Sequence, residues 1–293
     1  MIIVRLIGGL GNQLFQYATA RHLSVMHNTE LKLDIRAFEG YRLRKYSLAA
    51  FNIKEVFASH DEILSLASKE KKGVSKYLFR VTKLLQHPRS RTVFREHRVS
   101  PYNASILKTS SNLYLDGYWQ SEKYFVDVKD IILSEFTLQA KPSHLSLELA
   151  SQISKTQSIS LHIRRGDYIS NSNTNKLHGT TSLDYYKQSA NFFAQEIASP
   201  HFFVFSDDPD WVVKNLNLEF PTTFVTHNDA LTNYEDLWLM SLCKHNIIAN
   251  SSFSWWAAWL NSNPNKIVIA PEKWFNSSDI ETKDLVPQEW LRI

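Results

Sequence analysis

Short apolar runs alternate along the chain with longer stretches whose apolar residues recur at helical spacing. In the N-terminal half, the apolar run at 2–7 predicts a strand, 13–27 predicts a helix, and 31–34 predicts a second strand. A run of four to eight apolar residues is typical of a buried strand, and a period near 3.6 is typical of an amphipathic helix. The pattern therefore starts with a strand–helix–strand unit.

The C-terminal half repeats this alternation more clearly. Its predicted strands cover 158–163, 201–205, 222–225, 246–249 and 266–270, and its predicted helices cover 183–198, a short segment from 209, 234–242 and 253–260. Strands alternating with helices indicate parallel α/β layers in each half. The polar stretch 139–143 is the best linker, which predicts domains at 1–140 and 141–293. We expect two facing Rossmann-like domains with the ligand in the cleft between them.

Composition adds bounds to this picture. The chain has 293 residues, about twice a typical domain, and 43% of them are hydrophobic, which suffices for two cores. Cys243 is the single cysteine, so no intrachain disulfide can form, and a reducing compartment is expected. Neither a signal-peptide pattern nor an apolar run of membrane-spanning length is visible. The predicted location is the cytoplasm.

The net charge of +4 is small, but basic residues concentrate at 69–98, where ten lysines and arginines face two glutamates. Apolar residues recur there at helical spacing, which predicts an amphipathic basic helix. A solvated surface helix is one interpretation. A helix resting on an anionic membrane, near a lipid-linked acceptor, is the other. No nucleic-acid recognition motif accompanies the charge, so nucleic acid is not an expected partner.

The strand at 158–163 ends in an unusual run of charge, Arg164, Arg165, Gly166 and Asp167. Charge at the end of a core strand is costly unless something binds there. A guanidinium in that place can grip a diphosphate through two hydrogen bonds. The alternatives are an Arg164–Asp167 surface pair or an adhesion tripeptide, which a cytoplasmic chain would not use.

A glycine-rich turn follows the first predicted strand and contains Gly8, Gly9 and Gly11. A dinucleotide fingerprint would need a further glycine where Leu14 stands, and Asp34 is a weak ribose-binding acid, so a nicotinamide enzyme is not indicated. Two interpretations stay open. The glycines let backbone amides approach a ligand, or they form a tight turn with Asn12 as the helix N-cap.

Asp208 and Asp210 match the D-x-D pattern that holds a divalent metal in one class of glycosyltransferases. Asp208 is also a good N-cap, Pro209 suits the first helical position, and an acid suits the first turn. The helix-start signature favours the capping interpretation.

The stretch 247–260 predicts a short buried strand, a polar turn and a tryptophan-rich helix. Asn250, Ser251 and Ser252 supply an amide, hydroxyls and backbone N–H groups at a helix N-terminus, which is a phosphate cradle without a lysine. An ordinary cap above a tryptophan core is the alternative. Together with Arg164, the turn outlines a diphosphate pocket with no metal.

Taken together, four blocks resemble the bacterial α-1,2-fucosyltransferases of glycosyltransferase family 11. They are GGLGNQLFQYA at 8–18, GYWQSEKYF at 117–125, HIRRGDY at 162–168 and NSSFSWWAAWL at 250–260. The resemblance implies a GT-B fold, GDP-β-L-fucose as donor and inversion to an α-linked fucose. It also implies a galactose 2-hydroxyl as acceptor, no metal and no cofactor, and a setting in bacterial surface polysaccharide (O-antigen) synthesis.

By motif match, the resemblance assigns the diphosphate and its departure to Arg164, with His162 beside the nucleotide. The remaining donor-binding residues implied are Asn12, Ser251, Ser252, Phe253 and, by a transfer from related fucosyltransferases, Asp236 against guanine. A fixed cation close to the leaving diphosphate would make the main catalytic contribution, because it stabilises the negative charge that develops there.

The reaction also needs a base for the acceptor hydroxyl, and the residues leave it between Asp167 and Asp116. Three other functions remain open: a fucosyltransferase of another linkage, a metal-dependent transferase using Asp208 and Asp210, and a catalytically silent sugar- or nucleotide-binding protein.

Overall fold

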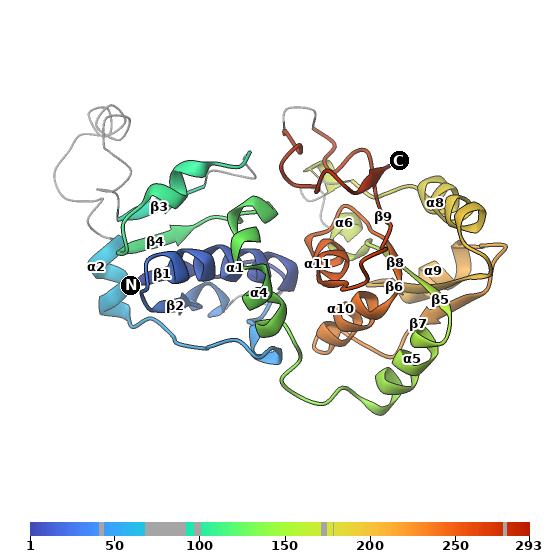
Figure 1. The fold of residues 1–293 in the computed structure, drawn as a ribbon, viewed down its shortest axis with the longest axis horizontal. Helices are drawn as coiled ribbons and strands as arrows, with labels where there is room; N and C mark the ends of the chain where they lie inside the picture. Colours follow the sequence, from blue (N-terminus) through green and yellow to red (C-terminus); the bar gives the residue numbers. More distant parts are fainter. Residues whose placement is uncertain (41–43, 68–91, 97–100, 171–174, 178, 278–279) are drawn as a thin grey trace. The chain divides into compact units, whose positions relative to one another are not determined.

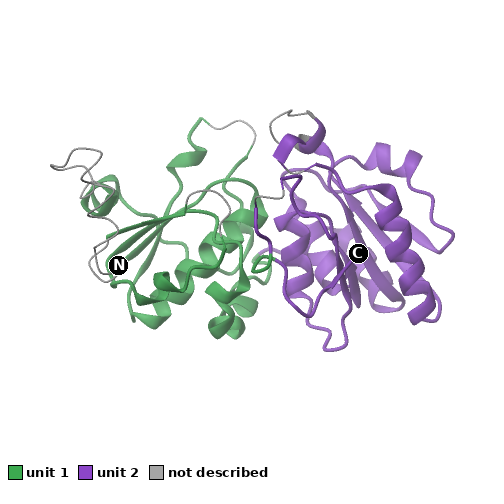
Figure 2. Cartoon of the chain, turned by 90° about the horizontal axis from the view of Figure 1, so that it is seen from above, with its two compact units in different colours: residues 1–139, 283–285 green, residues 140–282, 286–293 purple. Residues whose placement is uncertain are grey.

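The computed structural model describes residues 1–40, 44–67, 92–96, 101–170, 175–177, 179–277 and 280–293. The chain divides into two compact units (Figure 2): unit 1 holds residues 1–139 and 283–285, and unit 2 holds 140–282 and 286–293. The sequence places 283–285 in the C-terminal domain, whereas in the structure these three residues group with unit 1. Each unit is built of parallel strands and helices (Figure 1).

Among its described residues, unit 1 holds a four-stranded sheet in the order β2-β1-β4-β3, with every pairing parallel. Its strands are β1 (Ile2–Arg5), β2 (Leu31–Asp34), β3 (Val93–Arg95) and β4 (Leu113–Asp116), and its helices are α1 (Leu10–Met26), α2 (His60–Ala67) and α4 (Lys129–Glu135). β2 confirms the predicted strand at 31–34. β3 and β4 were not predicted.

The helix after the glycine turn begins earlier than predicted. α1 starts at Leu10 with Gly9 as its N-cap, so the prediction that Asn12 caps it is wrong. Gly8 has φ +80°, and a Cβ there would lie 2.6 Å from the Asn12 side chain, so this turn requires glycine. The block GGLGNQ therefore has a structural role as a strand-to-helix turn.

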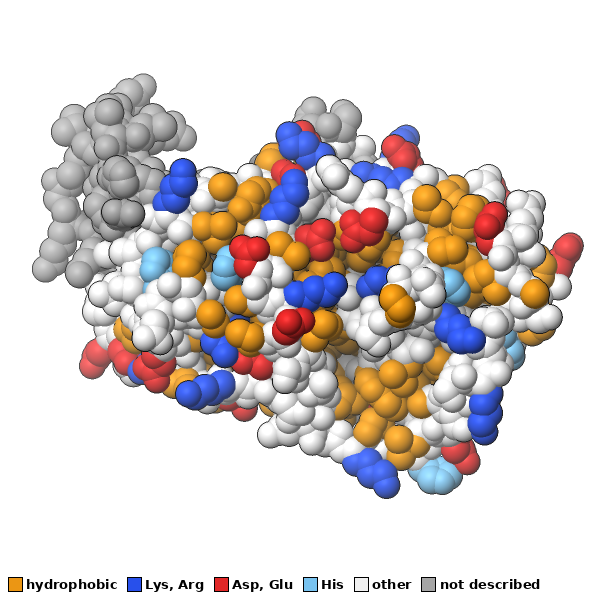
Figure 3. Space-filling model, in the orientation of Figure 1, with side chains coloured by type: hydrophobic (Ala, Val, Ile, Leu, Met, Phe, Trp, Pro, Cys, Tyr) orange, Lys and Arg blue, Asp and Glu red, His pale blue; other side chains and the backbone are white. Residues whose placement is uncertain are grey.

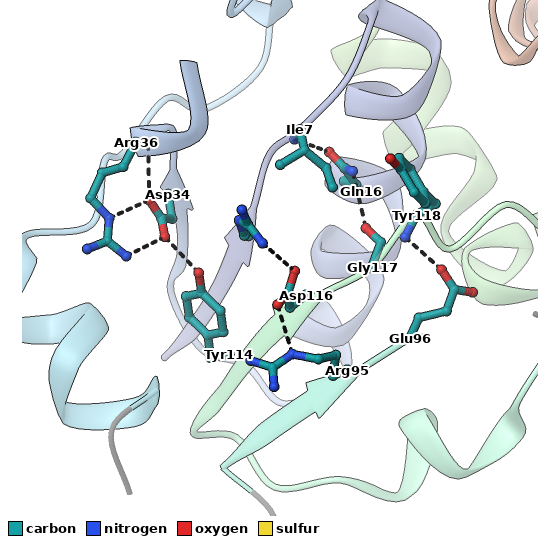
Figure 4. Close-up of polar contacts among 11 residues, drawn as sticks. Ile7, Gln16, Asp34, Arg36, Arg95, Glu96, Tyr114, Asp116, Gly117 and Tyr118 are labelled. Atoms are coloured by element: carbon teal, nitrogen blue, oxygen red, sulfur yellow. Dashed lines mark hydrogen bonds and ion pairs between the residues drawn. The ribbon is translucent and has the colours of Figure 1, made fainter. Parts of the chain in front are cut away.

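The two glutamines of the same block, Gln13 and Gln16, are fully buried and hydrogen-bonded. Gln16 accepts from the N–H of Ile7 (2.9 Å) and donates to the carbonyl of Gly117 (3.1 Å). Gln13 accepts from the N–H of Ser47 and donates to two further carbonyls. Buried amides are stable only when paired in this way. Gln16 thus joins two of the sequence blocks, 8–18 and 117–125, within unit 1 (Figure 4).

Unit 2 contains a six-stranded parallel sheet within its described residues, in the order β10-β9-β8-β5-β6-β7. Its strands are β5 (Gln157–Ile163), β6 (Pro200–Ser206), β7 (Thr222–Val225), β8 (His245–Ile247), β9 (Val268–Ala270) and β10 (Leu291–Arg292). Its helices are α5 (His144–Ser154), α6 (Gly166–Ser170), α8 (Leu183–Glu196), α9 (Pro209–Asn215), α10 (Asn233–Leu242) and α11 (Ser252–Leu260). The predicted elements of this half occur in the predicted order, and α5, α6 and β10 are additions to them.

The two faces of β5 differ in chemistry, although both are buried. Ile159, Leu161 and Ile163 pack into an apolar cluster with residues of α8 and α9. Alternate residues point to opposite faces of a strand, so Ser158, Ser160 and His162 face the other way, and all three are buried. Ser160 accepts a hydrogen bond from the Asn246 side chain (2.7 Å). This second face is polar and carries His162 at its end.

The predicted basic helix at 69–98 falls mostly outside the described residues. In the part that is described, Val93–Arg95 forms the strand β3, so the predicted helix does not extend that far. Across the described residues, none of the helices combines the length and the hydropathy needed to cross a membrane. Contact of the 69–98 segment with a membrane stays a prediction.

Candidate functional site in unit 2

The strand order of unit 2 marks one place at the edge of its sheet. The chain runs from β5 to β6 and β7 on one side and then returns to β8 on the other side of β5. In open parallel sheets, ligands bind at the carboxyl ends of the strands where the order reverses in this way. Between β5 and β8 this place is bordered by His162, Arg164 and the turn 250–252. Most of the predicted donor residues of unit 2 therefore border its switch point, whereas Asp236 lies in α10.

Arg164 is held by a carboxylate that sequence reasoning overlooked. Its Nη1 lies 2.8 Å from Oδ2 of Asp207, the residue directly after β6, and the Arg164 side chain is only 17% exposed. The other oxygen of Asp207 accepts the backbone N–H of Arg165 (2.8 Å). One carboxylate thus fixes both the guanidinium and the backbone that carries it. The available signal was an acid at the end of the neighbouring parallel strand.

Gly166 makes this arrangement possible. A Cβ on residue 166 would lie 2.3 Å from Oδ2 of Asp207, a distance that no side chain can occupy. The glycine of the HIRRGD block is therefore explained by the close approach of Asp207 to the start of α6.

Arg165 is held differently. Its Nε donates to Oδ2 of Asp208 (3.1 Å), and its guanidinium lies 3.3 Å from the centre of the Trp211 ring. An ion pair combined with ring stacking suits a planar guanidinium. Since both its charge and its flat face are engaged, Arg165 acts in the structure as a support beside Arg164.

These contacts correct the interpretation of the D-x-D pair. Asp208 occupies the N-cap position of α9, with Pro209 next to it, as predicted. Its side chain makes no capping hydrogen bond, because its carboxylate pairs with Arg165. Asp210 is exposed in the first turn. Within the described ranges, no three His, Cys, Asp or Glu side chains gather as they would around a metal ion.

His162 is buried at the end of β5, and its Nδ1 has no hydrogen-bond partner. Burial lowers the pKa of His162 to about 4, the nearby Asp207 opposes this, and Arg164 adds to it. The imidazole is therefore neutral at physiological pH. Its ring centre lies 5.5 Å from that of Phe253 in α11, so two predicted donor residues are in contact.

The turn before α11 follows the carboxyl end of β8 and caps the helix. Ser251 is the N-cap, and its hydroxyl accepts from the N–H of Phe253 (3.3 Å). Asn250 is buried, its side chain donates to the carbonyl of Trp274, and its carbonyl accepts from the Tyr168 hydroxyl. Trp255, Trp256 and Trp259 are core, as predicted. Ser251 and Ser252 lie at the N-terminus of the nine-residue helix α11, where the helix dipole is positive. This helix follows β8, the neighbour of β5.

Asp236 lies in the first turn of α10, which follows β7, and its Oδ1 accepts from Asn228 (2.7 Å). Burial raises the pKa of Asp236 to about 7; Asn228 opposes the shift and Glu235 adds to it. A ligand that donates two hydrogen bonds to this carboxylate would stabilise its charged form and lower its pKa.

Two predicted residues lie elsewhere. Asp167 belongs to α6, and its side chain is outside the described residues, so a role as base stays a prediction. Asn12 lies in α1 of unit 1, where its Oδ1 accepts from the Gln120 side chain (2.8 Å). Gly8, Gly9 and Gly11 of the glycine turn also belong to unit 1. Their approach to a donor stays a prediction, as does the placement of the site in a cleft between the domains.

Two α/β units, each built on a parallel sheet, are the elements of a GT-B fold. The GDP complex of a mutant of Arabidopsis thaliana FUT1 superposes with a TM-score of 0.52 at 12% identity, covering 99% of this chain and 75% of that one. At this identity the similarity concerns the fold alone.

The family follows from the sequence. The profile of Glycosyl transferase family 11 matches residues 1–293, and the chain belongs to this family. It is 36% identical to an α-1,2-colitosyltransferase of Escherichia coli, over 100% of this chain and 99% of the relative. It is 32% identical to the E. coli O-antigen biosynthesis glycosyltransferase WbnK, over 98% and 99%. Human galactoside α-(1,2)-fucosyltransferase 1 shares 26% identity over 62% of this chain and 53% of its own length.

Proposed function

We propose that this protein transfers L-fucose from GDP-β-L-fucose to the 2-hydroxyl of a galactoside, with inversion to an α-1,2 linkage. The observation that carries the proposal is Arg164, fixed by Asp207 at the switch point of unit 2, beside the helix N-terminus that begins at Ser251. A cation and a helix N-terminus at one strand edge suit a diphosphate. Family membership and the human relative's name support the reaction class.

The chemistry follows from where charge develops. As the bond between the sugar and GDP breaks, negative charge grows on the diphosphate oxygen while the sugar becomes oxocarbenium-like. Arg164 and the N–H groups before α11 would stabilise that oxygen without moving, since both are already held in place. Asp236 would accept hydrogen bonds from the guanine amino and imino groups. No step in this scheme needs a metal ion.

The test is a transfer assay with GDP-fucose and methyl β-D-galactopyranoside, with EDTA present, read by mass and by linkage-specific NMR. We expect an α-1,2-fucosyl galactoside that persists in EDTA. Arg164→Ala should lower kcat by roughly 100-fold or more, because a group aimed at the developing charge is lost. The control is Arg21→Ala, which removes a 2.8 Å ion pair between Arg21 and Glu135. Both residues belong to unit 1, whereas Arg164 belongs to unit 2.

Loss of the product on chelation would contradict metal independence, and an unchanged Arg164→Ala variant would contradict the role of the arginine. A product of another linkage would replace the α-1,2 assignment.

A colitose donor is the second candidate, because the 36% identical relative is a colitosyltransferase. Colitose is the 3-deoxy counterpart of fucose, so one hydroxyl separates the two donors. A site built to hydrogen-bond that hydroxyl rejects the deoxy sugar strongly. Competing the two donors in one assay, at equal concentration, gives the ratio of kcat/KM values. A ratio above ten for either donor decides between them.

A surface glycan such as O-antigen is the proposed setting, since the relative WbnK acts in O-antigen biosynthesis. On the face shown in Figure 3, acidic and basic side chains are interspersed over the described residues. No broad field of one charge covers this face of the described residues, which fits a glycan acceptor. A lipid-linked acceptor held near the membrane by 69–98 belongs to the same proposal. Membrane sedimentation that is unchanged on reversing the charge at Lys71, Lys72, Lys76 and Arg80 would contradict it.

A further inference from the structure

Unit 1 has its own row of charged side chains at the carboxyl ends of its strands. Arg5, Asp34, Asp116 and Arg95 are the last residues of β1, β2, β4 and β3. The register pairs Arg5 with Asp34 and Arg95 with Asp116, and the Val4–Leu115 pair places Arg5 beside Asp116. In the order β2-β1-β4-β3 the charges therefore alternate as minus, plus, minus, plus, on one face of the sheet.

The centre of this row is the switch point of the sheet. The chain passes from β1 to β2 on one side and later adds β4 on the other side of β1. The rule that places the donor site of unit 2 between β5 and β8 places a ligand of unit 1 between β1 and β4. Arg5 and Asp116 stand there, one on each strand.

The contacts show how the row is held. Oδ1 of Asp116 lies 3.1 Å from Nη1 of Arg5, and Oδ2 accepts from Nε of Arg95 (2.9 Å). The Asp116 side chain is 15% exposed, whereas those of Arg5 and Arg95 are 42% and 40% exposed. Figure 4 shows Asp116 and Arg95 at the ends of neighbouring strands. One largely buried carboxylate thus orients two guanidiniums that reach solvent.

Asp34 has a different role, because its carboxylate is fully engaged. It is buried and accepts from Nε and Nη2 of Arg36 and from the Tyr114 hydroxyl (2.9, 2.9 and 2.7 Å). The apolar residues two positions before the row, Ile3 and Tyr114 among them, pack against α2. The charged row lies beyond this apolar cover, where the Arg5 and Arg95 side chains on either side of Asp116 reach solvent.

The loop after Asp116 is fixed in an uncommon conformation. Trp119 has φ +56°, a left-handed conformation that a bulky residue rarely adopts. The Glu96 carboxylate accepts the N–H groups of Tyr118 (2.6 Å) and Trp119 (2.9 Å), and Gln16 binds the carbonyl of Gly117. Retained backbone strain of this kind is typical of functional loops. The GYWQ block thereby holds the chain rigidly beside the switch point.

We propose that Arg5, Asp116 and Arg95 bind hydroxyl groups of the acceptor sugar, a proposal that rests on the transferase function proposed above. Each sugar hydroxyl both donates and accepts a hydrogen bond. Guanidinium donors that alternate with a carboxylate acceptor match that property, and Asp116 would repel an anion. Both oxygens of Asp116 are already paired with guanidiniums, so binding suits this carboxylate better than accepting a proton from the acceptor.

The experiment compares Arg5→Gln and Asp116→Asn with the wild-type full chain. We expect the KM for methyl β-D-galactopyranoside to rise roughly 10- to 100-fold, because a hydrogen bond to a charged group is lost. The KM for GDP-fucose should stay within twofold. Arg21→Gln is the matched control, since its partner Glu135 is also 15% exposed and lies away from the strand ends.

An acceptor KM within twofold of wild type in both variants would overturn the proposal. So would an equal rise in the Arg21→Gln control, because the effect would then be structural.

A second readout separates this proposal from the transferase function. Direct binding of methyl β-D-galactopyranoside is followed by saturation-transfer NMR with GDP present. If the wild type transfers no fucose but binds the galactoside, and Arg5→Gln abolishes that binding, the proposed reaction fails and the sugar site stands. If neither protein binds the galactoside, the sugar site fails whatever the reaction.

Discussion

At the scale of single residues, the arginine site depends on the carboxylate of Asp207. Asp207 pairs with Arg164 and with the backbone of Arg165, and Gly166 leaves room for it. A guanidinium has five N–H donors, and one of its nitrogens, Nη1, pairs with Asp207. Asp207 is therefore a positioning residue for Arg164.

We expect Asp207→Asn to lower kcat by roughly 10- to 100-fold, with the acceptor KM little changed, because Arg164 loses the charge that aims it. Steady-state kinetics with each substrate varied separately measure this. Asp210→Asn, an exposed acid three residues away, is the control and should keep wild-type kcat. Equal kcat in both variants would show that Arg164 needs no such support.

His162 makes the stability of the protein depend on pH. Burial lowers its pKa to about 4 in the folded state, against an ordinary value near 6.5 when unfolded. The unfolded chain binds the extra proton between these values. The free energy of unfolding is therefore unaffected by His162 above pH 6.5. It decreases by about 3 kcal/mol as the pH falls from 6.5 to 4, because only the unfolded chain binds the proton there.

Urea unfolding of wild type and His162→Gln from pH 4 to 7 tests this. We expect the slope of unfolding free energy against pH to be smaller in the variant. The control, His144→Gln, removes an exposed histidine and should keep the wild-type slope. A variant slope equal to that of the wild type would assign the effect to other groups.

At the scale of elements, the helix that follows β8 owes its start to one hydroxyl. Ser251 caps α11 by accepting from Phe253, and it also sits at the switch point. We expect Ser251→Ala to cost about 1 kcal/mol of unfolding free energy. Ser251→Asn should restore most of it, because asparagine also caps well. Thermal melts of the three proteins measure this, and a melt of Ser251→Ala equal to wild type would exclude the cap as a stabilising contact.

Elements and site differ in how far the sequence predicts them. The strands 31–34 and 222–225 were predicted to the residue, because β-branched and apolar residues bounded by polar turns have a clear pattern. β3 was missed because three residues, Val93–Arg95, are too short to show a period, and it pairs with β4 over a separation that periodicity does not reveal.

The candidate site shows the same limit at finer scale. Arg164 and Ser251 stand in recognisable blocks of sequence, so both were predicted. Asp207 was missed as a partner because it reaches Arg164 across neighbouring strands, a contact set by the β5–β6 register. Asn12 as a cap was one of two open interpretations of the glycine turn, because a side-chain cap is a common helix start, whereas Gly9 begins α1 without one. Contacts between strands are tertiary, and a single sequence does not encode them locally.

At the scale of the whole molecule, a short segment near the C-terminus groups with unit 1. Residues 283–285 group with unit 1, between segments that belong to unit 2. Asp284 is the anchor, because its Oδ1 accepts from Lys123 (2.6 Å) and its Oδ2 accepts the N–H of Tyr102 (3.0 Å). The Asp284 side chain is 11% exposed, whereas that of Lys123 is 47% exposed. Unit 1 is thus completed only after residues 140–282 of unit 2 have been synthesised.

We expect Asp284→Ala to loosen unit 1 selectively, because the Tyr102 N–H and the Lys123 ammonium both lose their acceptor. Hydrogen exchange measured by mass spectrometry should quicken at residues 101–125, while β5 of unit 2 keeps wild-type protection. Asp130→Ala, which removes an exposed acid of α4, should leave both regions unchanged. Faster exchange in β5 as well would mean that the two units open together, and no change at 101–125 would mean that the anchor does not stabilise unit 1.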